Sequence, residues 1–194
     1  MSPPGRQRAF FFDQRYCTAC QACHMACKDY HDHPVGVIWR RVTTFQAGRY
    51  PSVRVTHLSQ ACYHCGQPPC VAVCPQGALQ KRAADGVVVL AADQCGGCQA
   101  CVVACPYGAI ATDPISGRSS KCDFCVALLD TGEPPVCVSA CPVHVLDVGW
   151  LDAMAGEPLQ APGLPDPDVL RPAVRMRRHR HHGSLDRGSG GPED

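Results

Sequence analysis

The chain has 194 residues, of which 16 are cysteine, and a formal net charge of +1 at pH 7. This length fits one or two small domains, and the wide spread of lysine and arginine argues against a nucleic-acid-binding protein. The longest apolar runs, such as residues 87–92, are far shorter than the roughly 20 residues of a membrane helix, so we expect no direct membrane span. No apolar signal segment follows residues 1–8, which disfavours disulfides because they need an oxidising compartment.

The cysteines fall into four groups of four along the chain, with none left over. The groups are Cys17, Cys20, Cys23 and Cys27; Cys62, Cys65, Cys70 and Cys74; Cys95, Cys98, Cys101 and Cys105; and Cys122, Cys125, Cys137 and Cys141. Cysteines at two-residue intervals wrap one corner of an iron–sulfur cubane, and a fourth, after three more residues, commonly ligates the other cluster of a pair. Zinc sites typically use two C-x2-C pairs a dozen or more residues apart, a spacing that only the fourth group imitates. The pattern predicts four [4Fe–4S] clusters, with zinc or disulfides as the alternatives.

Short secondary-structure elements are predicted between the cysteine groups. A similar apolar unit follows each Cys-Pro pair, at residues 76–79, 107–110 and 143–146. Asp85-Gly86 predicts a turn and hence a hairpin over residues 79–90, and Asp113-Pro114 with Ser116-Gly117 predicts another turn. The order of short strand, cluster loop, short helix and strand is typical of a ferredoxin-like unit. Because the apolar core is small, we expect the clusters to supply much of the folding free energy.

The scattered cations are expected to offset buried anionic cofactors. A [4Fe–4S] core with four thiolates carries roughly −2, so four clusters would lower the net charge of the protein to about −7. Lys28, beside Cys27, could shift the potential of the first cluster.

Motifs outside the cysteine spacing point to one family. They are Phe-Phe-Asp at 11–13, Ala-Cys-Lys-Asp-Tyr at 26–30, Trp-Arg-Arg-Val at 39–42, His-Cys-x2-Pro-Pro-Cys at 64–70, Lys-Arg-x2-Asp-Gly at 81–86, Ala-Cys-Pro-Tyr-Gly-Ala at 104–109 and Lys-Cys-Asp at 121–123. In these the chain resembles the iron–sulfur subunit of the dimethyl sulfoxide reductase family of molybdopterin oxidoreductases. The resemblance runs from about residue 10 to 149 and resumes at 164–175.

The resemblance implies an α+β fold of two interleaved bacterial-ferredoxin-like domains with long loops. Residues 10–58 plus 115–150 would form the domain of clusters 1 and 2, and residues 59–114 the domain of clusters 3 and 4. Residues 151–194 would form a Pro-rich and then Arg/His-rich tail that is extended or disordered.

The resemblance also implies crossed ligand sets. Cluster 1 would use Cys17, Cys20, Cys23 and Cys141; cluster 2 Cys27, Cys122, Cys125 and Cys137; cluster 3 Cys62, Cys65, Cys70 and Cys105; and cluster 4 Cys74, Cys95, Cys98 and Cys101. Some relatives replace the middle cysteine of the third group and carry a three-iron cluster, but Cys98 is present, so four irons are expected. His24, His31, His33, His57, His64 and His144 are alternative ligand types, although sixteen cysteines already complete four sets.

The implied function is electron transfer without catalysis by this chain. It would relay electrons between an integral-membrane, quinone-reactive anchor subunit and a molybdopterin-containing catalytic subunit, peripheral to the cytoplasmic membrane. Co-export with the catalytic subunit would place it on the outer face, and the cytoplasmic face is the alternative. Other functions that fit are the iron–sulfur subunit of a formate dehydrogenase or hydrogenase, a free polyferredoxin and a zinc-stapled interaction protein.

Overall fold

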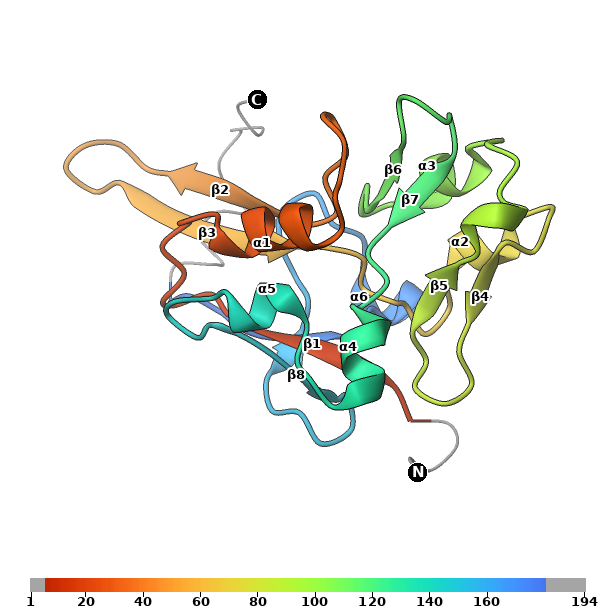
Figure 1. The fold of residues 1–194 in the computed structure, drawn as a ribbon. Helices are drawn as coiled ribbons and strands as arrows, with labels where there is room; N and C mark the ends of the chain where they lie inside the picture. The colour runs from red at the N-terminus through yellow and green to blue at the C-terminus, as the bar shows by residue number, and fades with distance from the viewer. Residues whose placement is uncertain (1–5, 181–194) are drawn as a thin grey trace.

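The structure is a computed structural model, and it describes residues 6–180 of the chain. Its elements are short and are joined by long loops (Figure 1). The strands are β1 (Arg8–Asp13), β2 (Arg41–Ala47), β3 (Arg54–Gln60), β4 (Leu79–Lys81), β5 (Val88–Leu90), β6 (Ile110–Thr112), β7 (Ser119–Lys121), β8 (Leu146–Trp150), β9 (Glu157–Pro158) and β10 (Val174–Arg177). The helices are α1 (Ala22–Tyr30), α2 (Pro69–Ala72), α3 (Ala100–Ala104), α4 (Val126–Thr131), α5 (Val136–Ser139) and α6 (Pro167–Leu170), with a 3₁₀ turn, η1, at Ala92–Gln94. Within residues 6–180, no helix is long and apolar enough to cross a membrane.

The largest sheet joins the two ends of the described chain. Its strand order is β8-β1-β10-β9, with β1 parallel to β10 and antiparallel to β8. Successive side chains of a strand point to opposite faces, and Phe10, Phe12, Val174 and Met176 are all buried on the core side. Strand β10 therefore lies inside the sheet, between β1 and β9.

Strand β10 lies within the segment from residue 151 that was predicted to form an extended or disordered tail, and it is an extended segment paired into the sheet. Met176 is fully buried, and Leu159 is 2% exposed. The prediction relied on proline content and on the basic run, but Val174 and Met176 alternate with Arg175 and Arg177, which is the pattern of a strand with one buried face. The rest of the Arg/His-rich run, from residue 181, lies outside the described residues.

A unit of short helix, Cys-Pro turn and short strand occurs three times, as α2–β4, α3–β6 and α5–β8. After each cysteine, the proline fixes φ and the third residue along is in the left-handed region. That third residue donates its backbone N–H to the cysteine carbonyl; the pairs are Gly77–Cys74 (3.2 Å), Gly108–Cys105 (3.1 Å) and His144–Cys141 (3.1 Å). The apolar repeat seen in the sequence is thus the start of a strand that follows a tight turn.

Both predicted turns are present. Strands β4 and β5 form an antiparallel hairpin in which Leu79 pairs with Leu90, and the Asp85 carboxylate accepts the Val87 N–H at 3.1 Å in its turn. Strands β6 and β7 form the second hairpin, whose turn is closed by Asp113 accepting from the Ile115 N–H at 2.8 Å.

Strands β2 and β3 form the longest hairpin, which projects from the body of the molecule (Figure 1). Its base is buried, with Leu58 1% exposed, whereas Tyr50 near its tip is 93% exposed. The base carries Arg40 and Ser59 toward the cysteines described below.

The core has two parts that correspond to two groups of elements. The larger apolar cluster includes Phe10 and Phe124, whose rings stack at 4.2 Å. The smaller one includes Leu79, Val88 and Ile110 from the two small hairpins. Helix α1 packs on α5 near the larger cluster, and α2 packs on α3 near the smaller one. Cysteines contribute to both of these apolar clusters, so the cysteine sites described next lie within the core.

Candidate iron–sulfur cluster sites

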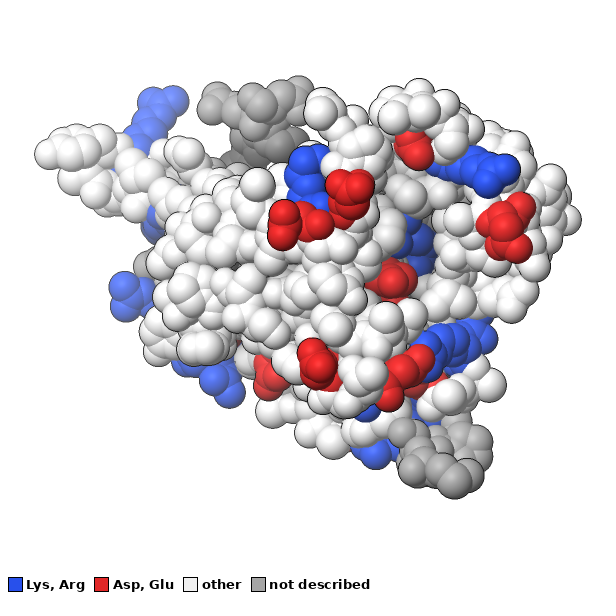
Figure 2. All heavy atoms as spheres, viewed as in Figure 1, with Lys and Arg blue, Asp and Glu red and all other residues white. Residues whose placement is uncertain are grey.

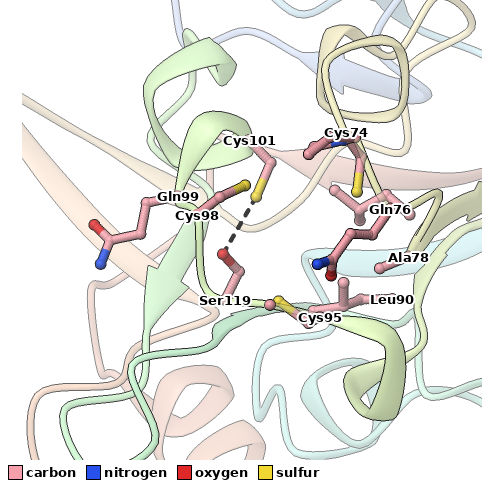
Figure 3. Close-up of a pocket in the computed structure, with 12 residues that line it drawn as sticks. Cys74, Gln76, Ala78, Leu90, Cys95, Cys98, Gln99, Cys101 and Ser119 are labelled. Carbon is pink, nitrogen blue, oxygen red and sulfur yellow. Dashed lines mark hydrogen bonds between the residues drawn. The ribbon is translucent and has the colours of Figure 1, made fainter.

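Four cysteines surround a cavity beside β4 and α3, here called site 4. Cys74, Cys95, Cys98 and Cys101 line it together with Gln76 and Ser119, and the empty space is about 320 Å³. Figure 3 shows the four sulfur atoms turned toward this common space. The Cys101 thiol donates to Ser119 Oγ at 3.3 Å (Figure 3).

Two further cavities have the same construction. Site 3 is lined by Cys62, Cys65, Cys70 and Cys105 and has about 360 Å³ of empty space. Site 1 is lined by Cys17, Cys20, Cys23 and Cys141 and has about 300 Å³.

The remaining four cysteines, Cys27, Cys122, Cys125 and Cys137, are buried near one another and are here called site 2. Burial raises the pKa of Cys27 to about 12, and charge on Cys137 or Cys125 contributes to the rise. Burial likewise raises the pKa of Cys122 well above its ordinary value, with Cys27 and Cys137 again among its neighbours. A cofactor that binds thiolates here must displace these protons as it binds.

Helix geometry explains how one cysteine group serves two sites. Two cysteines separated by three residues lie one turn apart on the same helix face. Helix α1 carries Cys23 to site 1 and Cys27 to site 2, and the segment through α5 carries Cys137 to site 2 and Cys141 to site 1. Helices α2 and α3 do the same between sites 3 and 4.

The two C-x2-C-x2-C loops share one backbone conformation. Ala19 and Gln21 have φ of 55° and 62°, and the matching Gly97 and Gln99 have φ of 74° and 58°. Left-handed residues at these places turn the loop around the space between its sulfurs. Ala19 carries a cost of about 1–2 kcal/mol that a glycine at this position would avoid.

The four sites follow one another through the molecule in the order 1, 2, 3, 4. Sites 1 and 2 meet at Cys23, where charge on Cys137 adds to the effect of burial in raising the thiol pKa. Sites 2 and 3 meet at Cys122, whose pKa is raised by burial and also by charge on Cys62. Sites 3 and 4 share the smaller apolar cluster, which contains both Cys70 and Cys101.

Buried and partly buried cations line this series of sites, and they were not predicted as site residues from the sequence. Lys121, 2% exposed, donates to the Cys122 carbonyl at 2.7 Å, and Lys81 donates to the Cys65 carbonyl at 2.7 Å. Arg40, also 2% exposed, lies beside site 1 and site 2 thiols. A signal for Arg40 was available in the Trp-Arg-Arg-Val stretch, which belongs to the motifs shared with the family.

Three of the polar residues raised in the sequence analysis have defined surroundings. His31 Nε2 lies 3.5 Å from Cys125 Sγ and 3.6 Å from an Asp123 carboxylate oxygen. The buried His64 accepts the Val88 N–H through Nδ1 at 3.0 Å. Lys28 donates to the carbonyls of His33 and Pro34 at 2.9 Å each, so backbone oxygens hold its ammonium.

The donor sets fit iron–sulfur clusters better than either alternative. All sixteen cysteines lie within the described residues and are free thiols, which argues against a disulfide framework. Zinc sites typically use two C-x2-C pairs a dozen or more residues apart, whereas sites 1, 3 and 4 each combine three cysteines of one group with a single cysteine of another. Three cavities that are each lined by four thiols in this way suit one cofactor bound repeatedly.

Comparison with known proteins identifies this cofactor. The 4Fe-4S dicluster domain family matches residues 53–151. A subunit of anaerobic dimethyl sulfoxide reductase from Haemophilus influenzae is 34% identical over 187 residues, covering 90% of this chain and 91% of the relative. The subunit of the same name from Escherichia coli is 40% identical over 156 residues, covering 76% of each sequence. A sulfite dehydrogenase subunit from Allochromatium vinosum is 36% identical over 159 residues, covering 71% of this chain and 66% of that one.

The matches and the four-cysteine sites lead to the same assignment. The fold is a mixed α/β ferredoxin-like [4Fe–4S] fold, and the protein holds multiple [4Fe–4S] clusters. It belongs to the iron–sulfur, electron-transfer subunits of the dimethyl sulfoxide reductase family.

Proposed function

We propose that the chain relays electrons between a molybdopterin-containing catalytic subunit and a quinone-reactive membrane anchor, and that it catalyses no reaction alone. Sites 1 to 4 would each hold one [4Fe–4S] cluster through the four cysteines that meet there, which are the crossed sets implied by the family resemblance. Each cluster supplies one-electron chemistry whose potential depends on burial, charge and hydrogen bonds to sulfur.

The observation that carries this proposal is the difference in exposure along the series of sites. Cys20 of site 1 and Cys98 of site 4 are exposed, whereas all four cysteines of site 2 are buried. A series that opens to the surface at its two ends and is enclosed in the middle suits the passage of electrons between two partners. A storage or structural role gives no reason for both ends to be open.

Exposed apolar side chains near both open sites support two docking surfaces. Val103, between two cysteines at the site 4 end, is 89% exposed. Tyr16, beside Cys17 of site 1, is 62% exposed, and Val143 of the site 1 wall is 42% exposed. The face in Figure 2 shows lysine and arginine scattered singly or beside acidic side chains, without a continuous basic patch. Apolar contact with protein partners is therefore the better explanation of the exposed side chains than contact with a polyanion.

We also propose that residues 10–58 plus 115–150 form one ferredoxin-like domain and residues 59–114 the other. The pairing of β1 with β8 and the packing of α1 on α5 support the first unit. The two small hairpins with α2 and α3 support the second. As part of such a complex, the chain would be peripheral to the cytoplasmic membrane.

The test is purification of the complex through an affinity tag on this chain after anaerobic growth of its own host. We expect a molybdenum-containing subunit to copurify, with about 16 irons on this chain for four clusters. A quinol should reduce the clusters, and dimethyl sulfoxide, the substrate named for the relatives, should reoxidise them.

Two alanine variants and a control refine this experiment. Cys20→Ala and Cys98→Ala, at opposite ends of the series, should each abolish quinol-driven turnover of the complex. Arg82→Met, which removes the ion pairs with Asp130 and Asp85 but touches no cysteine site, should leave turnover unchanged. Isolation of the tagged chain without any molybdenum protein would favour a free polyferredoxin, and about four zinc ions without acid-labile sulfide would end the iron–sulfur assignment.

A further inference from the structure

Arg40 is a buried cation whose charge has no carboxylate partner among the described residues. Its side chain contacts the face of the Phe10 ring, with Cζ 4.6 Å from the ring centroid, and its Nη1 donates to Ser59 Oγ at 3.1 Å. No ion pair is formed with any acidic side chain of residues 6–180. An isolated charge is costly to bury unless it is paired and hydrogen-bonded.

The hydrogen bonds of Arg40 are incomplete as well. A guanidinium has five N–H donors, yet Nε and Nη2 are buried and make no hydrogen bond. Ser59, which binds Nη1, also lies 3.6 Å from Cys23 Sγ of site 1. Arg40 is therefore connected to a site 1 cysteine through one hydroxyl, while the N–H groups of Nε and Nη2 have no acceptor.

The anions that surround Arg40 are thiolates of sites 1 and 2. Burial would lower the pKa of its guanidinium, but charges on Cys137, Cys122, Cys23 and Cys27 reverse the effect and raise it. Three of these four cysteines belong to site 2 and one to site 1. An anionic cofactor at each site would supply the charge and the acceptors that Arg40 otherwise lacks.

The other fully buried cation shows what a satisfied arrangement looks like. Lys121 donates to the carbonyls of Val88 and Cys122, so backbone oxygens take up its protons. Arg40 has a single hydroxyl instead, and its planar fork can serve two acceptors at once. The hydrogen bonds of Lys121 are thus supplied by the backbone, whereas those of Arg40 require acceptors from the cofactors at sites 1 and 2.

Resting on the ligand sets of the proposed function, we propose that Arg40 is a positioning and potential-tuning residue shared by sites 1 and 2, whose Nε and Nη2 donate to sulfur of the bound clusters. A nearby positive charge favours the reduced, more negative form of a cluster, and hydrogen bonds to sulfur act in the same direction. Arg40 therefore raises the reduction potentials at sites 1 and 2, beside which it lies, more than those at sites 3 and 4. It makes the enclosed part of the series easier to reduce.

The experiment measures the midpoint potential of each cluster in the intact complex by redox titration followed by electron paramagnetic resonance. Cys20→Ala and Cys27→Ala identify the signals of sites 1 and 2. Arg40→Met keeps the bulk of the side chain and removes its charge, whereas Arg40→Lys keeps the charge and loses the planar fork. Arg82→Met removes an arginine charge from ion pairs with the exposed Asp130 and the buried Asp85 and serves as the matched control.

We expect Arg40→Met to lower the potentials at sites 1 and 2, and to change those at sites 3 and 4 less. Arg40→Lys should give a smaller shift at site 2, and Arg82→Met none. Unchanged potentials at sites 1 and 2 in an iron-replete Arg40→Met complex would overturn the proposal. Should that variant fail to retain iron, Arg40→Lys decides, because a site 2 potential equal to that of the wild type would show that the fork's donors are unnecessary.

This outcome can be separated from failure of the proposed function. The wild-type chain tests that function by whether a catalytic subunit copurifies with it. The Arg40 proposal is tested only by shifts in the potentials of the chain's own clusters, which are measurable whatever partner is bound.

Discussion

Replacing Cys20 and Cys141 with alanine, singly and together, tests the crossed ligand sets through iron content. Both cysteines line the cavity of site 1, although Cys141 belongs by sequence to the group of Cys122, Cys125 and Cys137. Four clusters contain about 16 irons, so loss of one leaves about 12 and loss of two leaves about 8. If both residues serve one cluster, each single variant and the double variant should all retain about 12 irons.

The assay combines iron and acid-labile sulfide analysis with electron paramagnetic resonance of the reduced complex. The same spectral component should disappear from all three variants, and Cys27→Ala should remove a different one. Iron that falls to about 8 in the double variant, with a second component lost, would refute the crossed arrangement. It would mean that Cys141 serves the cluster of its own sequence group.

Three other predictions concern the frame that holds the sites. Met176→Ala should lower the free energy of unfolding by about 2–5 kcal/mol in anaerobic urea titrations, because the side chain is fully buried in the sheet; no change would show that β10 adds little to the core. Ala19→Gly should raise the free energy of unfolding by about 0.5–1 kcal/mol, because φ at this residue is 55°. A loss of stability would contradict the left-handed conformation of residue 19. Asp13→Asn should lower the free energy of unfolding by about 1–2 kcal/mol at neutral pH, because it weakens the hydrogen bond from Arg15. This hydrogen bond lowers the pKa of Asp13 in the folded protein. The stabilisation by the Asp13 carboxylate is therefore present above the ordinary carboxyl pKa and is lost as the pH falls through the lowered pKa. Unfolding curves at pH 7 should accordingly show Asp13→Asn less stable than the wild type, and equal stability would contradict the contribution of this hydrogen bond.

The features that the sequence predicted well depend on local rules. Asp85-Gly86 and Ser116-Gly117 close hairpins where expected, because a turn needs only a few adjacent residues of the right type. The three-residue spacing between cysteines corresponds to one helical turn, which is also a local property. The proximity of Cys141 to Cys17 does not follow from a local rule. It depends on packing between α1 and α5, and only the resemblance to a family pointed to it.

Arg40 and Arg41 show where local rules stop. They are neighbours in the sequence and identical in type, yet Arg40 is buried beside the cysteines while Arg41 binds the carbonyls of Tyr107 and Gly108 nearer the surface. Consecutive side chains of an extended segment point to opposite sides, so one arginine enters the core while the next does not. Net charge and composition carry no information about that choice.

The place of β10 in the sheet could not be predicted from the sequence for a related reason. Proline residues and a run of arginine and histidine dominate the composition after residue 151, and they are typical of unstructured segments. The strand β10 occupies only Val174–Arg177 within that stretch. Composition must be averaged over many more residues than this strand contains. Such an average hides the alternation of apolar and charged residues within the strand.

The parallel pairing of β1 with β10 has a consequence for the order in which the protein matures. A chain leaves the ribosome from its N-terminus, so β1 remains without this neighbour until residues 174–177 have been synthesised. All eight cysteines around sites 3 and 4 lie between residues 62 and 105, whereas sites 1 and 2 need cysteines up to residue 141. Loading of metal is therefore expected to start in the middle of the chain and to finish at the sheet that joins its ends. A chain truncated before residue 174 should acquire the clusters of sites 3 and 4, whereas its site 1 should stay open to oxygen and proteases.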